Sequence, residues 1–293
     1  MNSRKQRALI FLHIPKTAGT TLNCLLDKQY PSKYSCKIHS PYPHNFQDEL
    51  NKISRVQKEE INFFKGHMAF GLHKILPQPS TYITMLRDPV ERVISLYYFI
   101  LRTPDHYLYN LVREHQMSLK ECISSRISSE LENGQTRLLS GNLELAKNQM
   151  GSFEPSSPEW LEAAKKNLEN NFTAFGITER FDESLILFKR KLGWRLPLYV
   201  KHNVNKNRPM KETISPDVIR LIEKNNELDI ELYNYAKDYF EEQINQQCSN
   251  FKKELMTFKS LNEIYKYYAY FNGYSSNVIT KLNSIIRGKA LLG

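Results

Sequence analysis

The chain has 293 residues, of which 41% are hydrophobic and 25% charged, and these proportions exclude a low-complexity or disordered chain. This length suffices for one large α/β domain, or for such a domain with a small appendage. Lysine and arginine number 41 against 31 for aspartate and glutamate, which gives a formal net charge of +10. A basic surface suits nucleic acid, anionic lipid, acidic glycan or a nucleotide, and charge alone does not choose among them.

The cysteines and the hydropathy exclude some further classes of protein. The four cysteines are widely spaced and suggest reduced thiols and no metal site: Cys24, Cys36, Cys122 and Cys248. The apolar run before Pro15 is too short for a signal peptide. No segment approaches the roughly 20 apolar residues that cross a bilayer. We therefore predict a soluble, cytoplasmic protein.

The first half of the chain alternates between strand and helix patterns. Residues 9–13 form an apolar run typical of a buried strand, and residues 19–28 have helical spacing. The next predicted elements are a loop over residues 31–45, a helix over 47–56 and a short strand over 62–65. Residues 81–86 alternate and are β-branched, which predicts a strand. The sequence from Asp88 to Glu91 then has the capping pattern of a helix start.

The second half continues this pattern. A broken helical region is predicted over residues 108–140, a helix from Ser157, a strand over 172–178, a helix over 181–192, a basic loop over 201–210 and one long helix from Ser215 to Tyr239. Alternating strands and helices predict an α/β fold with a P-loop-like parallel sheet flanked by helices. We expect one domain over residues 1–245 and a helical C-terminal extension over 246–293.

An anion-binding loop is predicted between the first strand and the first helix. Its residues are Pro15, Lys16, Thr17, Ala18, Gly19, Thr20 and Thr21. The N-terminus of a helix carries unpaired N–H donors and a partial positive charge, so it binds phosphate-like anions. The spacing differs from the GxxxxGK[ST] pattern of nucleoside triphosphate loops. Considered alone, the segment also suits an ordinary strand–turn–helix with a surface lysine.

The loop resembles the 5′-phosphosulfate loop of sulfotransferases, in particular the heparan sulfate 2-O- and 6-O-type branch, and this resemblance covers roughly residues 9–240. That family transfers a sulfuryl group from 3′-phosphoadenosine 5′-phosphosulfate to a hydroxyl. The resemblance implies that Lys16 acts catalytically at the oxygen bridging phosphate and sulfate, while residues 15–21 bind the 5′ end of the donor. Family members often have serine where Gly19 stands.

Two further segments extend the resemblance. Arg87 and Ser95 match the family's 3′-phosphate motif, in which an Arg-Asp-Pro helix start precedes a serine eight residues after the arginine. The alternative is a surface helix whose Arg87 pairs with a neighbouring acid. Gly66 and His67 resemble a strand end whose histidine is the general base, and an imidazole with a pKa of about 6.5 suits that role. A lone histidine is otherwise more often structural.

Two weaker matches concern the acceptor and the nucleotide. The first resembles an Asn-x-Gln-x-Arg element near the acceptor groove, which implies substrate binding by Asn133, Gln135 and Arg137. A polar turn that buttresses the donor loop is the alternative. The second is a basic loop that matches a segment closing over the nucleotide, with Lys201, Lys206 and Arg208 as candidate donor-binding residues. An ordinary solvated loop explains these residues equally well.

The predicted function is therefore an O-sulfotransferase that modifies a glycan or related acceptor and needs no metal. A nucleoside-triphosphate-dependent phosphotransferase and a non-catalytic polyanion-binding module are the alternatives. The basic charge suits an anionic glycan, peripheral contact with a membrane stays open, and nucleic acid is not an expected partner. Because eukaryotic members of this type are usually anchored in the Golgi, the missing anchor favours a bacterial source.

Overall fold

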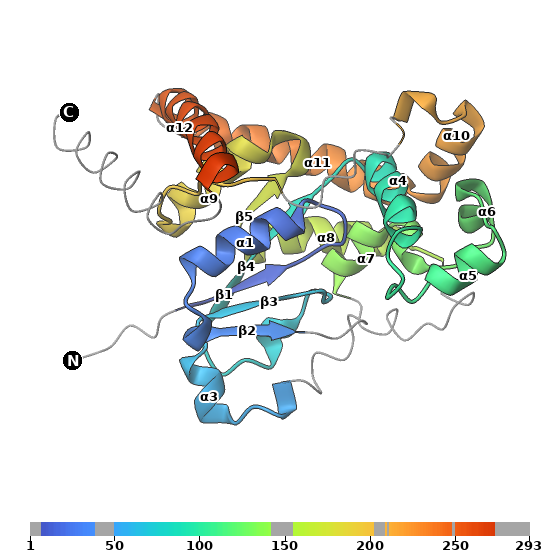
Figure 1. Ribbon diagram of the computed structural model, residues 1–293. Coiled ribbons are helices and arrows are strands. Elements are labelled where there is room, and N and C mark those ends of the chain that lie inside the picture. Colours follow the sequence, from blue (N-terminus) through green and yellow to red (C-terminus); the bar gives the residue numbers. More distant parts are fainter. Residues whose placement is uncertain are drawn as a thin grey trace, which may run out of the picture.

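The computed structural model describes residues 7–38, 50–141, 155–201, 209, 211–247 and 250–272. At its centre is a five-stranded sheet in the order β2-β3-β1-β4-β5, and all its pairings are parallel (Figure 1). The strands are β1 (Ala8–Leu12), β2 (Ser35–Ile38), β3 (Phe63–Gly66), β4 (Ser80–Leu86) and β5 (Phe172–Ile177). Helices flank this sheet, so the predicted α/β class is confirmed.

The described helices fall into two packing groups. They are α1 (Gly19–Gln29), α3 (Arg55–Glu60), α4 (Pro89–Ile100), α5 (Tyr109–Glu114), α6 (Leu119–Ser124), α7 (Gly134–Ser140), α8 (Pro158–Asn171), α9 (Phe181–Leu192), α10 (Pro216–Asn225), α11 (Glu227–Asn245) and α12 (Asn250–Asn272). The main core lies between the sheet and helices that include α1, α8, α9 and α11. A second core joins α4, α5, α6 and α10, which lie together at the right of Figure 1.

The central strands are apolar because the fold buries both faces of the sheet. All five residues of β1 are buried, as are all four of β3. Strands covered on both faces lose the usual alternation of apolar and polar residues. This explains why residues 9–13 could be recognised as a strand from the sequence alone.

Three local predictions were wrong in position. The predicted loop over residues 31–45 contains β2, an edge strand whose side chains are mostly accessible and which therefore lacks an apolar run. Within the helix predicted over 47–56, residues 50 and 51 are helical, residues 52–54 interrupt the helix, and residues 47–49 lie outside the described part. The next helix, α3, begins at Arg55 because Ser54 and Gln57 form a capping box. The single long helix predicted from Ser215 is two helices, α10 and α11, which meet at Asn226.

Helix α12 packs against the rest of the fold. Phe251 and Phe258 belong to the main core, and Glu254 pairs with Lys189 (2.7 Å) and Arg190 (2.7 Å) of α9. The predicted domain boundary at residue 245 stays a prediction. Within the described residues, none of the helices combines the length and the apolar character needed to span a bilayer.

Candidate active site

Three predicted segments lie together at the carboxyl edge of the sheet. The register pairs Leu12 of β1 with Gly66 of β3, so that His13 and His67 leave adjacent strands at the same level. Arg87 leaves β4, which is the neighbour of β1 on its other side. Open α/β sheets bind ligands at this edge, at the point where the strand order reverses.

The loop after β1 has a backbone suited to an anion. Lys16 and Ala18 both have left-handed conformations, with φ of 69° and 62°. The hydroxyl of Thr17 donates to the carbonyl of Ile14 at 2.8 Å and so fixes the turn between them. Ala18 is the N-cap of α1, and no side chain caps this helix end. Alternating left-handed residues and an uncapped helix start both direct N–H groups outward, which fits a phosphate or sulfate group.

The side chain of Lys16 reaches helix α4. Its Nζ lies over the ring of Phe99, 3.9 Å from the ring centroid. Phe99 is four residues after Ser95, so both lie on the same face of α4. Ser95 is half-buried there. The helix that carries the predicted 3′-phosphate serine therefore also contacts the predicted catalytic lysine.

Arg87 connects the two predicted halves of the donor site. Its Nη1 donates to the backbone carbonyl of Lys16 at 3.0 Å, and its Nη2 donates to Glu91 at 3.2 Å. Glu179 lies 3.9 Å from its Nε. The pairing of Arg87 with Glu91 and Glu179 fits the alternative in which Arg87 only pairs with neighbouring acids. Its contact with the Lys16 carbonyl also places Arg87 at the donor loop. The side chain of Arg87, which is 17% exposed, makes both kinds of contact.

The helix start after Arg87 follows its prediction in part. Asp88 caps α4, with its Oδ1 accepting from the backbone N–H of Glu91 at 2.9 Å, and Pro89 is the first helical residue. The carboxylate of Glu91, expected to complete a capping box, instead pairs with Arg87. The acid beside Arg87 thus orients the guanidinium.

The imidazole of His67 has a defined tautomer. Its Nδ1 lies 2.9 Å from the backbone carbonyl of His13. Since a carbonyl can only accept, Nδ1 must carry the hydrogen, and the neutral ring keeps its lone pair on Nε2. Desolvation by the surrounding protein lowers the pKa of His67, although part of the residue is exposed. Glu130 and the His13 carbonyl oppose this lowering of the pKa, whereas Lys37 and Lys16 add to it.

The predicted acceptor residues Asn133, Gln135 and Arg137 are buried and do not lie on an open surface. Their exposed fractions are 6%, 0% and 7%. The amide of Gln135 brackets Arg87: its Oε1 accepts from the Arg87 N–H at 3.0 Å, and its Nε2 donates to the Arg87 carbonyl at 2.9 Å. These contacts favour the alternative that Gln135 buttresses the donor site, and acceptor binding by the three residues stays a prediction.

The buttress is anchored by a buried polar network. Asp229 of α11 is completely buried and accepts from the N–H groups of Gln135 (3.0 Å) and Thr136 (2.7 Å). The guanidinium of Arg92 lies 3.6 Å from the same carboxylate. Asn226, at the break between α10 and α11, accepts from the N–H of Asn133 at 2.9 Å. The break that the sequence did not reveal therefore holds the start of α7 in place.

Replacing Gln135 with leucine is expected to lower the free energy of unfolding by about 1–3 kcal/mol, because two partly buried backbone groups of Arg87 would lose their hydrogen-bond partners. Urea denaturation measures this change. Affinity for an anion bound by Arg87 should fall as well, since the backbone of Arg87 would no longer be held. An unfolding free energy equal to that of the wild type would contradict the buttress.

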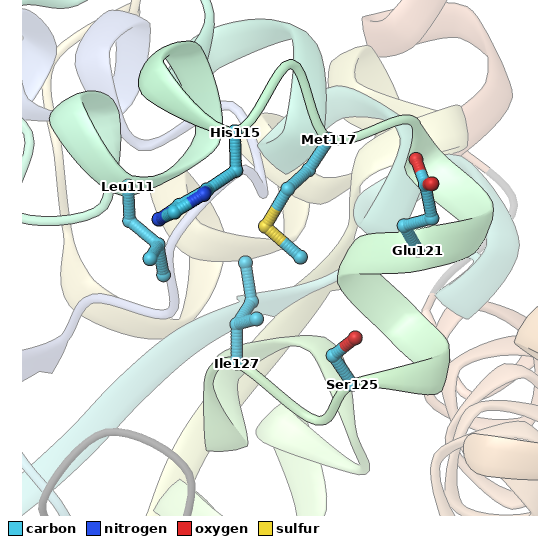
Figure 2. Close-up of a pocket in the computed structure, with 6 residues that line it drawn as sticks. All are labelled: Leu111, His115, Met117, Glu121, Ser125 and Ile127. Atoms are coloured by element: carbon cyan, nitrogen blue, oxygen red, sulfur yellow. The ribbon is translucent and has the colours of Figure 1, made fainter.

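The remaining predicted donor residues lie elsewhere or outside the description. Lys201 is exposed, and Lys206 and Arg208 fall outside the described residues. A hollow between α5 and α6 contains none of the predicted residues and is lined by Leu111, His115, Met117, Glu121, Ser125 and Ile127 (Figure 2).

Sequence reasoning missed several residues that surround Lys16 and His67. The ring of His106 contacts Phe99 edge-on at 5.7 Å and stacks on Tyr107 at 4.8 Å. The hydroxyl of Tyr107 donates to Glu130 at 3.1 Å. His106 and Tyr107 lie in the connection between α4 and α5, Glu130 lies within the broken helical region, and none of the three belongs to a recognised motif. Their proximity arises from tertiary packing, so no sequence signal could have found them.

The sequence of the chain is also similar to known protein families. The family model described as galactose-3-O-sulfotransferase matches residues 1–264, which is most of the chain. The chain belongs to this family. It is thus an O-sulfotransferase of the carbohydrate sulfotransferase type, which confirms the recognition made from the loop and the Arg-Asp-Pro motif.

Curated relatives agree with the family assignment. A heparin sulfate O-sulfotransferase of Drosophila melanogaster is 26% identical over 80% of this chain and 72% of its own length. A heparan-sulfate 6-O-sulfotransferase 1 of Cricetulus griseus is 28% identical over 84% of this chain and 69% of its own. A heparan sulfate 2-O-sulfotransferase 1 of Gallus gallus is 28% identical over 80% and 70%. These relatives are animal proteins, and the bacterial source stays a prediction.

Proposed function

We propose that this sulfotransferase moves a sulfuryl group from 3′-phosphoadenosine 5′-phosphosulfate to a glycan hydroxyl, with His67 as the general base. The observation that carries the proposal is the hydrogen bond that Nη1 of Arg87 donates to the Lys16 carbonyl at 3.0 Å. It joins the predicted 3′-phosphate residue to the predicted 5′ loop. A nucleotide with anionic groups at both its 3′ and its 5′ positions suits a site with two adjoining anion-binding parts. A nucleoside triphosphate, in contrast, carries all three phosphates at the 5′ position.

The donor side of the site is cationic and rich in N–H groups. The start of α1 and the left-handed residues Lys16 and Ala18 suit the 5′-phosphosulfate. Arg87 and Ser95 suit the 3′-phosphate, because a guanidinium can donate two parallel hydrogen bonds to one phosphate. The ammonium of Lys16 would stabilise the negative charge that develops on the leaving phosphate oxygen.

The acceptor hydroxyl would lose its proton to His67. Its oxygen forms a bond to sulfur while the bond from sulfur to the phosphate oxygen breaks, and the proton moves to Nε2 of His67. The products are a sulfate ester and adenosine 3′,5′-bisphosphate. A lowered pKa keeps His67 neutral at neutral pH, so Nε2 is available as a base.

The acceptor side supports a glycan. The relatives are named for heparan sulfate, and the net charge of +10 suits an anionic chain of sugars. Tyr107 is 45% exposed, and its ring stacks on that of His106. The His106 ring contacts Phe99, which in turn lies under the ammonium of Lys16. Aromatic faces next to hydrogen-bonding groups suit sugar rings, which have both apolar and polar sides.

Two measurements test the proposal. Calorimetry should find that adenosine 3′,5′-bisphosphate binds more tightly than ATP with magnesium, and labelled sulfate should pass from the donor to a member of a glycan panel. Preference for ATP would favour the phosphotransferase. Binding of heparin without any nucleotide would favour the polyanion-binding module.

Replacing Glu130 with glutamine is expected to move the acidic limb of the pH–rate profile to lower pH. The negative charge of Glu130 raises the pKa of His67, so its removal lowers that pKa and leaves the base neutral in more acidic solution. Glutamine keeps an oxygen that can accept from Tyr107. The matched control is E114Q on the exposed end of α5. A limb that moves to higher pH would contradict the assignment of His67.

A further inference from the structure

The ring of His13 stacks on two other rings. Phe11, two residues earlier on β1, lies at 5.3 Å between centroids and 17° between planes. His67, beyond the end of the neighbouring strand β3, lies at 4.1 Å and 28°. We propose that His13 is a positioning residue that holds the imidazole of His67 in the orientation needed for proton transfer. This inference rests on the proposed function, because it assigns a task to a neighbour of the proposed base.

The backbone of His13 supplies the first half of this support. Its N–H donates to the carbonyl of Gly66 at 2.9 Å, which continues the pairing of β1 with β3 beyond Leu12. Its carbonyl then accepts from Nδ1 of His67 at 2.9 Å. The acceptor of this hydrogen bond is therefore fixed by the sheet, and the bond directs Nε2 of His67 away from the sheet backbone.

The imidazole of His13 supplies the second half. A hydrogen bond to one ring nitrogen still lets the ring rotate about that bond, whereas a flat ring packed against its face prevents the rotation. Burial lowers the pKa of His13 well below its usual value, and the charges of His67, Lys16 and Lys65 lower it further. A neutral His13 can stay stacked when His67 accepts a proton, since there is no second positive charge to repel it.

Gly19 makes room for this arrangement. A Cβ at position 19 would lie 1.6 Å from Nε2 of His13, far inside any contact distance. The ring of His13 thus occupies the space in which a side chain at the start of α1 would begin. Asn23, one turn further along α1, lies 3.5 Å from Nδ1 of His13 and borders the ring on that side. The packing of the His13 ring therefore depends on the absence of a side chain at Gly19.

The test compares H13F with H13L in the full chain. Phenylalanine keeps a flat ring and removes both nitrogens, whereas leucine keeps an apolar side chain of similar size without a flat face. We expect H13F to retain kcat within a few-fold of the wild type. We expect H13L to lose up to about 100-fold in kcat, as misplacement of a catalytic group does, with little change in the KM of the donor. An equal loss of kcat in both variants would overturn the proposal.

Nitrogen-detected NMR of His67 gives a second readout that needs no substrate. The wild type and H13F should show the tautomer with hydrogen on Nδ1, and H13L should show an average of both tautomers. An unchanged tautomer in H13L would overturn the role of the His13 ring. If the wild type bound no adenosine 3′,5′-bisphosphate and transferred no sulfate, the proposed function would fail, and NMR would still decide whether His13 orients His67.

Discussion

Replacing His67 with asparagine is expected to lower kcat by about 100- to 10,000-fold, which is the range that a positioned general base contributes. In the wild type, Nδ1 of His67 donates to the His13 carbonyl at 2.9 Å. The amide of asparagine can also donate to this carbonyl, but it offers no basic nitrogen. The affinity for adenosine 3′,5′-bisphosphate should stay close to that of the wild type, because the loop after β1 and Arg87 are unchanged. Single-turnover transfer of labelled sulfate and calorimetry measure the two quantities.

The matched control for this variant is H115N. His115 is exposed, directly follows α5 and lines the hollow of Figure 2, which contains none of the residues assigned to the reaction. Its turnover should equal that of the wild type. If H67N kept the turnover of H115N while the donor still bound, another group would have to accept the proton, and the assignment of His67 would be wrong.

The parts of the fold that the sequence revealed are those with local causes. The strand at β1 could be predicted because both of its faces are buried, which leaves an unbroken apolar run. The start of α4 could be predicted because a cap is formed by neighbours in sequence, here Asp88 and Glu91. Residues of this kind carry their structural role in their own short segment.

The parts that the sequence did not reveal depend on distant partners. Edge strand β2 is defined by its hydrogen bonds to β3, and its own residues have no apolar pattern. The break at Asn226 follows from bonds to Leu131 and Asn133, which lie more than ninety positions earlier in the chain. Helical periodicity runs through such a break unchanged, so a pattern search continues the helix across it.

The candidate site divides in the same way. Lys16, His67 and Arg87 could be proposed because each lies in a short motif at a strand end. Gln135 was noticed in the sequence, yet its contact is with the backbone of Arg87, and nothing in its own motif distinguishes that task from binding a substrate. Burial decides between such readings, and burial is a property of the whole fold.

Replacing Arg87 with lysine is expected to weaken the binding of adenosine 3′,5′-bisphosphate by about 10- to 150-fold, since a hydrogen bond to a charged group contributes about 1.5–3 kcal/mol. Lysine keeps the positive charge but not the planar fork that can reach a phosphate while it donates to the Lys16 carbonyl. Calorimetry measures the dissociation constant. Arg190, which pairs with Glu254 between α9 and α12, provides the matched control R190K, and its affinity should stay unchanged.

A change of ligand separates the two tasks of Arg87. Adenosine 5′-monophosphate lacks the 3′-phosphate, so R87K should weaken its binding only through the loosened loop at Lys16, which is the smaller effect. The ratio of the two losses therefore isolates the contact with the 3′-phosphate, in the way that a double-mutant cycle isolates one pair of groups. Equal losses for the two nucleotides would mean that Arg87 supports the loop without touching the 3′-phosphate. The guanidinium would then be a structural partner of Glu91 and Glu179, which is the alternative that its ion pairs allow.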